Sequence, residues 1–317
     1  MSTDPDLTAR LLAEALPYIQ RFHDRVVVVK YGGNAMTAEG DAGFARDVVL
    51  MHSVGLRPVV VHGGGPQITE LMARLGKEAT FRNGLRVTDA ESLEITRMVL
   101  VGKVNRELVG AINRYGPLAV GLSGEDAWLI GARLRDPELG FVGDVTTINP
   151  ALLDRLLAER LIPVVATIGV DEEGQAYNIN ADTVAGAIAQ ALSAEKIIFL
   201  TDIEGLRRDV DAPDSLISHC SSAELRLLVD EGVVSSGMIP KVEACLHAVE
   251  STVASAHLID GRRPHVLLLE LFTDAGIGTM ITRYPTRHDP VPAARTPAPT
   301  APTTQTAPTT STPGGTR

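Results

Sequence analysis

The chain alternates short, continuous apolar runs with longer stretches in which apolar residues recur every three or four positions. Continuous β-branched runs are typical of parallel strands buried on both faces, and the longer periodicity is typical of amphipathic helices. Strands that alternate with helices in this way predict βαβ units and a mostly parallel sheet, so we expect an α/β fold. The runs predicted as strands are 26–29, 58–61, 118–122, 162–166, 197–200 and 265–269.

Helical periodicity begins before the first strand. Leu12, Leu16 and Ile19 share one face of a predicted helix over Leu7–Phe22, which Pro17 would interrupt and which has no obvious place in the sheet. A stretch from 128 to 148 that carries aromatic residues predicts a hairpin. The other predicted helices are 44–51, 68–75, 95–99, 104–112, 152–157, 184–192, 223–229 and 239–253.

Charge and composition narrow the class of function. The 29 Lys and Arg against 39 Asp and Glu give a net charge of −10, which disfavours nucleic acid and anionic membranes as partners. A small substrate is therefore the expected partner. The two cysteines are too few for a disulfide framework and match no zinc spacing, so we expect buried thiols in a reducing compartment.

The ends of the chain indicate a cytoplasmic protein. The N-terminus lacks the basic and apolar regions of a secretory signal, and no apolar run reaches the roughly 18 residues of a membrane helix. Residues 289–317 contain 7 Pro, 9 Thr and 5 Ala. Such a composition buries too little surface to offset its ordering entropy, so we expect a disordered tail.

Two glycine-rich loops follow two of the predicted strands. They are Lys30-Tyr-Gly-Gly33 and His62-Gly-Gly-Gly-Pro66. Ligands of open α/β sheets bind beyond the carboxyl ends of the strands, and backbone N–H groups without a neighbouring Cβ can approach phosphate oxygens closely. The loops therefore predict an anion site to which Lys30 adds a positive charge, although two tight turns and a lysine at a strand end are the plainer interpretation.

Four more clusters follow in order: Asn83-Gly-Leu-Arg86-Val-Thr, Asn178-Ile-Asn180-Ala-Asp182, Thr201-Asp202-Ile-Glu-Gly205 and Gly237-Met-Ile-Pro-Lys241. Together with the two loops, they resemble the acetylglutamate kinases of the amino-acid kinase family, from about residue 24 to residue 285. The resemblance implies a three-layer αβα sandwich with a mostly parallel central sheet and two lobes. It also implies that ATP phosphorylates the side-chain carboxylate of N-acetyl-L-glutamate in arginine biosynthesis. Magnesium would be bound through the nucleotide phosphates, with no metal site of the protein's own.

The same resemblance assigns roles to individual residues. Lys30 and Lys241 would clamp the transferred phosphoryl group, and Asp182 would organise them, with a helix N-cap as its alternative role. Arg86, in a polar loop, suits bidentate capture of a carboxylate. His62 would shape its loop. The predicted substrate residues are Gly64, Gly65, Arg86 and Asn178, and the predicted phosphate and ATP residues are Gly32, Gly33, Gly63, Thr201, Asp202, Gly205, Gly237 and Met238.

Other classes fit less well. The chain contains no GxxxxGK[ST] run and no GxGxxG after a strand, which argues against a P-loop enzyme and a dinucleotide dehydrogenase. A sibling kinase for glutamate, carbamate, aspartate or a nucleoside monophosphate would differ in the loops of Arg86 and Asn178. A non-catalytic amino-acid sensor is a further alternative, against which both Lys30 and Lys241 argue.

The N-terminal helix resembles an extension found in arginine-inhibited acetylglutamate kinases, which form hexamers as trimers of dimers. The resemblance implies a homo-oligomer inhibited by L-arginine, whereas the plainer alternative packs the helix on its own subunit and leaves Glu270 solvated. The implied domains are 1–22 for oligomerisation and arginine sensing, 23–192 for acetylglutamate and dimerisation, 193–288 for ATP, and 289–317 as the tail. The residues that the resemblance implies for the L-arginine effector site are Tyr18, His257, Glu270, Gly276 and Gly278.

Overall fold

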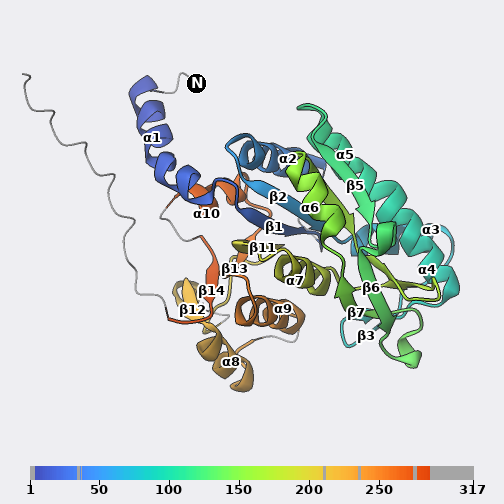
Figure 1. Cartoon of the computed structure of the whole chain (residues 1–317). Helices are drawn as coiled ribbons and strands as arrows, with labels where there is room; N and C mark the ends of the chain where they lie inside the picture. The colour runs from blue at the N-terminus through green and yellow to red at the C-terminus, as the bar shows by residue number, and fades with distance from the viewer. Residues whose placement is uncertain are drawn as a thin grey trace, which may run out of the picture. The chain divides into compact units, whose positions relative to one another are not determined.

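An eight-stranded sheet carries the fold, in the order β12-β14-β13-β11-β1-β2-β8-β5 (Figure 1). The six strands from β13 to β5 run parallel, and β14 with β12 runs opposite to them at one edge. This confirms the predicted α/β class. The strands are β1 (Val26–Tyr31), β2 (Arg57–His62), β5 (Ala119–Ser123), β8 (Ile162–Ala166), β11 (Lys196–Thr201), β12 (His219–Ser221), β13 (Ser255–Asp260) and β14 (Thr279–Thr282).

The structure is a computed structural model that describes residues 4–33, 36, 38–209, 212–234, 237–273 and 277–285. The predicted tail 289–317 and Gly276 lie outside these residues. The helices are α1 (Pro5–Phe22), α2 (Ala38–Ser53), α3 (Gly65–Arg74), α4 (Ala90–Arg97), α5 (Asn105–Asn113), α6 (Ala151–Ala158), α7 (Ala181–Ala191), α8 (Ser222–Asp230), α9 (Ile239–Glu250) and α10 (Val266–Phe272), with a π-helix η2 (Met98–Val104). The described residues also form the short 3₁₀ turns η3 (Asp126–Trp128), η4 (Pro137–Leu139) and η5 (Pro213–Ser215).

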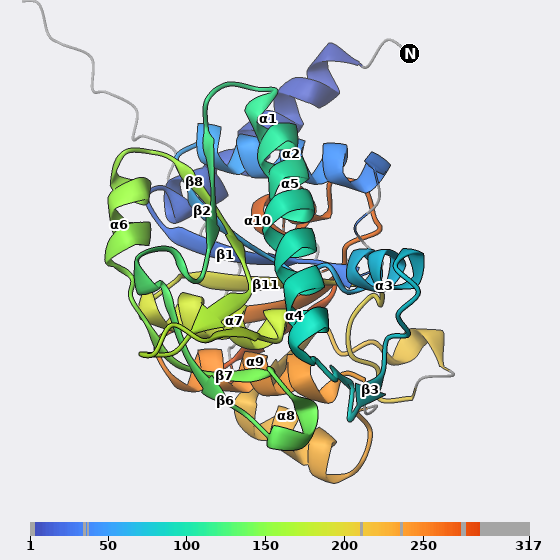
Figure 2. The same cartoon turned by 90° about the vertical axis from the view of Figure 1, so that its right-hand side faces the viewer.

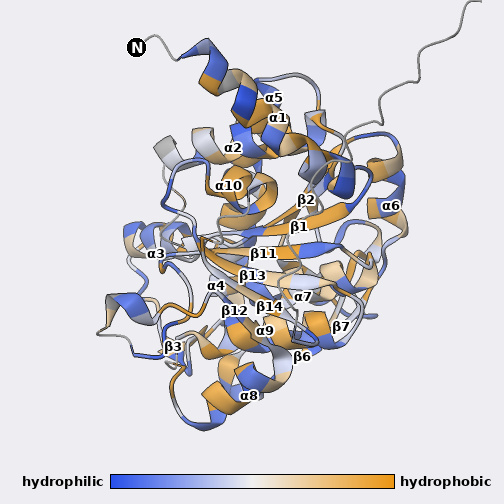
Figure 3. Cartoon of the chain, turned by 90° about the vertical axis from the view of Figure 1, so that its left-hand side faces the viewer, coloured by the Kyte–Doolittle hydropathy of each residue, from blue (hydrophilic) through white to orange (hydrophobic). Residues whose placement is uncertain are grey.

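Each face of the large sheet buries its own hydrophobic core. Along β1, Val28 belongs to the core that includes residues of α6, α7, α8 and α9, whereas Val27 and Val29 belong to the core that includes residues of α2, α3, α5 and α10. Successive side chains of a strand point to opposite faces, so a continuous valine run serves both cores. Figure 2 shows α2 on one side of β1 and β11 and α7 with α9 on the other, and Figure 3 shows that the strands between them are hydrophobic. The predicted three layers are confirmed.

Two smaller sheets flank the large one. The predicted hairpin between 128 and 148 is formed by β6 (Ile130–Leu134) and β7 (Gly143–Ile148), which pair antiparallel. They belong to a four-stranded sheet with β9 (Ile168–Val170) and β10 (Ala176–Asn178). A separate two-stranded hairpin consists of β3 (Phe81–Arg82) and β4 (Leu85–Arg86). The division into two lobes stays a prediction.

One predicted strand is wrong. The run 265–269 lies in helix α10, whose Val266, Leu267 and Leu271 are buried against the core. The strand of this region is β13, whose polar Ser255, His257 and Asp260 leave no continuous apolar run to mark it. A short apolar run does not distinguish a buried strand from a buried helix, so only packing decides.

Helix α1 runs without a break through Pro17, contrary to the predicted interruption. Its Phe22 is buried and it contacts α10, but Leu7, Leu11, Leu12 and Leu16 are more than half exposed. An amphipathic helix normally buries its apolar face, and here only the C-terminal end does so within the described chain. No helix among the described residues has the length and apolar character to cross a membrane.

Candidate active site

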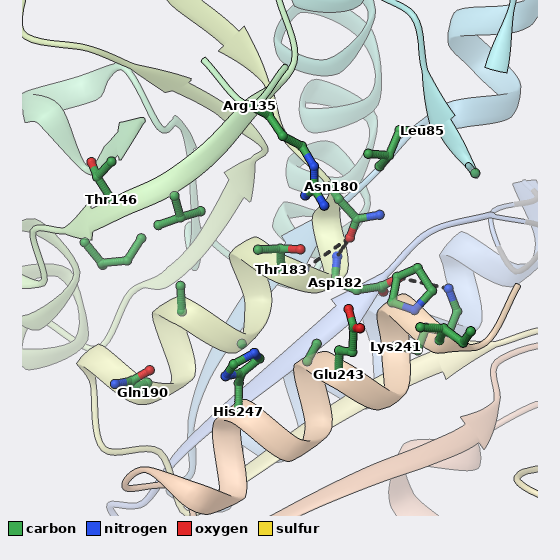
Figure 4. A pocket seen from close by; sticks show the side chains of 18 of the residues that line it. Leu85, Arg135, Thr146, Asn180, Asp182, Thr183, Gln190, Lys241, Glu243 and His247 are labelled. Atoms are coloured by element: carbon green, nitrogen blue, oxygen red, sulfur yellow. Dashed lines mark hydrogen bonds and ion pairs between the residues drawn. The ribbon is translucent and has the colours of Figure 1, made fainter. Parts of the chain in front are cut away.

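Two lysines meet one carboxylate at the end of the sheet. Lys30 is the penultimate residue of β1, Lys241 lies in the first turn of α9, and Asp182 lies in the first turn of α7. Lys30 Nζ is 3.0 Å from Asp182 Oδ1, and Lys241 Nζ donates a hydrogen bond of 2.9 Å to Oδ2. Figure 4 shows Asp182 and Lys241 pointing toward each other at the wall of a cavity. The three predicted catalytic residues therefore form one cluster.

Asp182 is ionised despite its burial. Burial alone raises the pKa of a carboxyl group, but Lys30 and Lys241 outweigh it and hold the pKa of Asp182 below its usual value. Each carboxylate oxygen faces one ammonium group. The pair of lysines is thus fixed by one shared counter-ion.

Asp182 is not the helix N-cap that was its alternative role. The cap is Asn180, whose side-chain oxygen accepts from the backbone N–H of Asp182 at 2.9 Å and of Thr183 at 3.1 Å. Capping by Asn180 satisfies the first amides of α7 and leaves the Asp182 carboxylate to the lysines.

The two glycine loops lie against each other. The backbone N–H of Gly63 donates to Tyr31 O at 3.0 Å, and a Cβ on Gly32 would lie 3.3 Å from Gly63 N and 3.5 Å from Lys30 Nζ. Gly33 has a φ of 68°, a conformation that favours glycine. Of the predicted phosphate residues, Gly32 therefore adjoins both the Lys30 ammonium and Gly63 of the second loop.

Helix α3 begins inside the second loop. Gly64 is its N-cap and brings no capping side chain, and Pro66 has no N–H to offer. A Cβ on Gly64 would lie 2.7 Å from Leu100 Cδ2, so this position is closely packed, whereas Gly65 has open space beside it. A helix start with bare amides is suited to binding an anion.

Arg86 is buried on β4, not in a polar loop as predicted. Its Nη2 donates to Gly65 O at 2.9 Å and to Thr69 Oγ1 at 2.8 Å, and its guanidinium lies 4.7 Å from the centre of the Phe81 ring. Burial lowers the pKa of Arg86, and no acidic side chain of the described residues pairs with it. The hairpin thus delivers an unbalanced positive charge to the start of α3.

Asn178 is joined to Arg86 through one threonine. Its Nδ2 donates to Thr88 Oγ1 at 3.3 Å, and this hydroxyl donates to the carbonyl of Arg86 at 2.9 Å. Thr88 is completely buried. The two residues predicted to bind the substrate's polar groups therefore belong to one hydrogen-bond chain, although they come from β10 and β4.

Two cavities are lined by residues at the start of α9. The larger, about 1180 Å³, is lined by Gly84, Asn180, Asp182, Gly237 and Lys241 among others. The smaller, about 400 Å³, is lined by Asp202, Gly205, Val233, Val234, Met238 and Arg262 among others. Gly237 and Met238 are adjacent in the chain, so the walls of the two cavities adjoin at the start of α9.

Thr201 has a supporting position. It is buried at the end of β11, and its hydroxyl donates to Ile203 O at 2.8 Å in the loop toward Gly205. Thr201 is not among the residues that line the smaller cavity, whereas Asp202 and Gly205 are.

A second buried charged cluster lies beneath α1. Glu270 Oε1 is 2.6 Å from His257 Nδ1, and Lys196 Nζ is 3.1 Å from His257 Nε2 and 5.2 Å from the centre of the Phe22 ring. Burial and the neighbouring Lys196 lower the pKa of His257 to about 4, and burial lowers the pKa of Lys196 to about 8. Glu270 is therefore paired and buried, not solvated.

Three other residues were predicted to bind the effector L-arginine, and the structure describes two of them. Tyr18 is half-buried in α1 and packs against the core that contains Phe22. A Cβ on Gly278 would lie 2.2 Å from Leu258 O, so the chain passes tightly against β13 there. Gly276 lies outside the described residues.

Sequence reasoning assigned no role to three polar residues. Asn180 caps α7, Lys196 is the first residue of β11, and Asn105 begins α5 and reaches His62. A buried lysine at a strand start gives no local signal. Asn180 carried one, because an asparagine directly before a helical pattern is typical of an N-cap.

Comparison with known proteins identifies the family. The model of the amino acid kinase family matches residues 25–260. An acetylglutamate kinase of Moorella thermoacetica is 51% identical over 89% of this chain and 99% of its own, and one of Synechococcus is 54% identical over 88% and 98%.

Solved structures agree in fold. N-acetylglutamate synthase from Neisseria gonorrhoeae, complexed with coenzyme A and L-arginine, superposes with a TM-score of 0.76 at 26% identity over 87% of this chain. This chain spans 65% of the synthase's length. Carbamate kinase from Giardia lamblia bound to AMP-PNP shares the fold, with a TM-score of 0.60 at 16% identity over 82% of this chain and 99% of its own. The chain belongs to the amino acid kinase family and, within it, to the acetylglutamate kinases.

Proposed function

We propose that this protein transfers the γ-phosphoryl group of ATP to the side-chain carboxylate of N-acetyl-L-glutamate, as a cytoplasmic enzyme of arginine biosynthesis. The observation that carries the proposal is the Lys30–Asp182–Lys241 cluster at the junction of the two glycine loops and the start of α9. Its relatives at 51–54% identity are acetylglutamate kinases.

In this reaction a carboxylate oxygen of acetylglutamate attacks the γ-phosphorus, and the bond from that phosphorus to the β–γ bridging oxygen breaks. The acceptor is already ionised, so no general base is needed. Asp182 is not available as a base, because both its oxygens face ammonium groups. Catalysis then rests on alignment and on neutralisation of charge by Lys30 and Lys241.

Acetylglutamate lies, in this proposal, between the start of α3 and the β3–β4 hairpin. Both hydrogens of Arg86 Nη2 are used within the chain, on Gly65 O and Thr69 Oγ1. A carboxylate is a stronger acceptor than a carbonyl or hydroxyl oxygen, so the substrate would take over this donor. Asn178, joined to Arg86 through Thr88, would bind the substrate's amide or α-carboxylate.

ATP occupies the smaller cavity with its base and ribose, beside Asp202, Gly205 and Met238. Its phosphates pass Gly237 toward Lys241, Gly32, Gly33 and Gly63. Magnesium would be held chiefly through the nucleotide phosphates and water, and it would supply charge neutralisation there. The carboxylate nearest to the reaction, Asp182, is occupied by the lysines.

An assay of ADP release tests the proposal. We expect release that depends on acetylglutamate, with glutamate, aspartate and carbamate as controls. Activity with one of these and not with acetylglutamate would assign the protein to a sibling kinase, and absence of all activity would favour a sensor.

Arg86→Lys tests the acetylglutamate site. A single ammonium group cannot reproduce a planar fork that spans Gly65 O, Thr69 Oγ1 and a carboxylate, so the KM for acetylglutamate should rise by about tenfold or more. The KM for ATP should change by less than about twofold, since its cavity lies elsewhere. Equal increases in both constants would mean that Arg86 organises the whole site.

Arginine inhibition is a further part of the proposal. The guanidinium of arginine is a partner for Glu270, which at present binds neutral His257, and Tyr18 of α1 packs nearby. The exposed leucines of α1 would be covered by a neighbouring subunit, which would join dimers into a hexameric ring. Arginine would then favour one arrangement of α1 and α10 over another and inhibit by differential affinity.

Deletion of residues 1–22 tests this part. We expect an active dimer by analytical ultracentrifugation, with a half-inhibitory arginine concentration at least about tenfold higher than that of the full chain, because one side of the effector site is lost. Leu12→Asp is the matched point variant of the deletion, since it changes the exposed face of α1 and leaves the rest of the helix in place. A deletion variant that still forms the same oligomer and is inhibited at the original concentration would refute the role of the helix.

A further inference from the structure

A pair of completely buried polar side chains lies directly under the second glycine loop. His62 ends β2, and Asn105 begins α5 after the π-helix η2. Asn105 Nδ2 is 3.0 Å from His62 Nε2, and His62 Nδ1 is 3.0 Å from Gly63 O. Neither residue reaches the cavities at the start of α9, so the reaction described above gives them no role.

The orientation of the Asn105 amide is fixed by its surroundings. Its Nδ2 donates to Val164 O at 2.8 Å and lies 3.5 Å from Leu122 O, whereas its Oδ1 accepts from Arg106 Nη2. A flipped amide would set its oxygen against two backbone carbonyls and its hydrogens against a guanidinium. The group facing His62 is therefore the NH₂.

The amide in turn selects the tautomer of His62. Because Nε2 faces a donor, it must be the unprotonated acceptor, and the single ring hydrogen must be on Nδ1. That hydrogen points at Gly63 O, which is the acceptor within reach. Burial lowers the pKa of His62 to about 4, so the ring is neutral at physiological pH and keeps this tautomer.

A hydrogen bond to Gly63 O fixes the plane of the Gly63–Gly64 peptide. In a trans peptide the N–H points opposite to the C=O, so holding the Gly63 carbonyl toward His62 turns the Gly64 N–H away from it. Gly64 is buried, and within the described chain its N–H has no acceptor. Buried backbone donors are almost always paired, so this N–H is suited to a ligand.

The π-helix closes the other side of the same loop. Leu100 and Val104 lie 2.7 Å and 3.3 Å from where a Cβ of Gly64 would be. One wide turn of η2 thus places two apolar contacts on Gly64 and then the Asn105 amide under His62. π-Turns within helices often occur at functional sites, where they re-aim side chains.

We propose that His62 and Asn105 are positioning residues, which fix the Gly63–Gly64 peptide so that the Gly64 N–H points at the oxygens of the transferred phosphoryl group or its acceptor. The catalytic part of this inference rests on the proposed phosphoryl transfer. The assignment of the His62 tautomer does not depend on that function. Neither residue touches substrate, and both act through the backbone of the loop.

The first test examines the wild-type protein and uses a variant only to assign the His62 signals. Long-range ¹H–¹⁵N NMR of the histidine-labelled wild-type protein, with His62 assigned through His62→Asn, should show His62 as the neutral Nδ1–H tautomer between pH 6 and 8. Free histidine mostly carries its hydrogen on Nε2, so the result is diagnostic. An Nε2–H or a protonated ring would overturn the proposal, because His62 could then not receive from Asn105.

The second test separates turnover from binding. His62→Leu removes the bond to Gly63 O but leaves the Asn105 amide bound to Val164 O, so the fold should persist. We expect kcat to fall by about tenfold or more, and the KM for ATP to stay within about twofold, since a donor acting on the reacting oxygens matters most in the transition state. His62→Asn restores an amide donor near the position of Nδ1 and should recover part of the loss.

Thr96→Val is the matched control. Thr96 is equally buried in the same helical run, and its hydroxyl has no hydrogen-bond partner in the described chain. Its kcat should match the wild type. A kcat of His62→Leu within about twofold of the wild type, or equal losses in His62→Leu and His62→Asn, would overturn the positioning role. A wild-type protein that lacks acetylglutamate-dependent ADP release would instead refute the proposed function, with the tautomer result unaffected.

Discussion

Two buried clusters of this protein contain a lysine and a carboxylate, and they differ in charge balance. The cluster at the glycine loops has two ammonium groups for one carboxylate, Lys30 and Lys241 with Asp182, a net charge of 2 − 1 = +1. The cluster beneath α1 has one ammonium, one carboxylate and a neutral imidazole, a net charge of 1 − 1 = 0.

The difference in net charge suits the two clusters to two different functions. A surplus positive charge held by a buried counter-ion is suited to stabilising anionic oxygens without moving. A cluster with no net charge has no surplus charge with which to bind a ligand. It responds to a ligand only when the ligand replaces one of the groups that pair within the cluster. The first cluster therefore fits catalysis and the second fits regulation, although both use the same residue types.

Removing the surplus charge should have the largest effect. Lys30→Ala and Lys241→Ala should each lower kcat by about 10²–10³, with much smaller changes in KM, because the charge matters most where charge develops. Steady-state kinetics with both substrates measures this. Lys103→Ala is the control, since Lys103 is exposed on η2 and has no ion pair in the described chain. Near-normal turnover in either active-site variant would remove that lysine from the mechanism.

Breaking the balance of the second cluster should have an intermediate effect, visible in regulation. Glu270→Gln keeps the shape but removes the charge that a guanidinium would bind, so the half-inhibitory arginine concentration should rise by about tenfold or more. The inhibition curve at fixed substrate measures it. Glu250→Gln, which loses only a surface ion pair with Arg226, should leave the curve in place. Unchanged inhibition in Glu270→Gln would place the arginine site elsewhere.

Low pH should lower the free energy of unfolding through His257, the imidazole that only the second cluster contains. We expect this effect to be the smallest of the three. The pKa of His257 is about 4 in the fold against 6.5 as the ordinary value. Between these values the unfolded chain binds more protons, so this contribution to stability is complete above about pH 6.5 and is lost as pH falls through about 4. Burial also lowers the pKa of His62, so its contribution to the free energy of unfolding is likewise lost as the pH falls.

Urea unfolding at pH 7 and pH 5 should therefore show a lower free energy of unfolding at pH 5. His257→Gln should reduce the difference between the two pH values, because glutamine does not titrate. An equal difference in wild type and His257→Gln would show that His257 titrates alike in the folded and unfolded chain.

Sequence alone predicted the first cluster far better than the second. Lys30 lies at the end of a strand just before a glycine pair, and Asp182 and Lys241 lie at helix starts. Such positions converge at one edge of a parallel sheet. Lys196 begins a strand that reads as apolar, and its contacts with His257 and Phe22 come from distant elements. The pairing of β13 with β11 creates that site, and the sequence did not predict β13 because its polar residues interrupt the apolar run.

The same limit applies to Arg86 and Asn105. The Asn-Gly turn before Arg86 predicted a loop, but the pairing of two-residue strands and the contacts to α3 bury it. Asn105 has no special local pattern, because its partners are carbonyls on β5 and β8. Local patterns predict which element a residue joins, and tertiary packing decides which polar groups meet.

The contact between the two glycine loops also has an evolutionary consequence. A side chain at Gly32 would approach Gly63 N, one at Gly64 would meet Leu100, and the Lys30 ammonium lies next to the first of these contacts. The loops belong to different strands but cannot mutate independently, since a larger residue in one requires a compensating change in its neighbour. In descendants of this chain we therefore expect the two loops and Leu100 to be inherited together, as one unit whose members tolerate change only in concert.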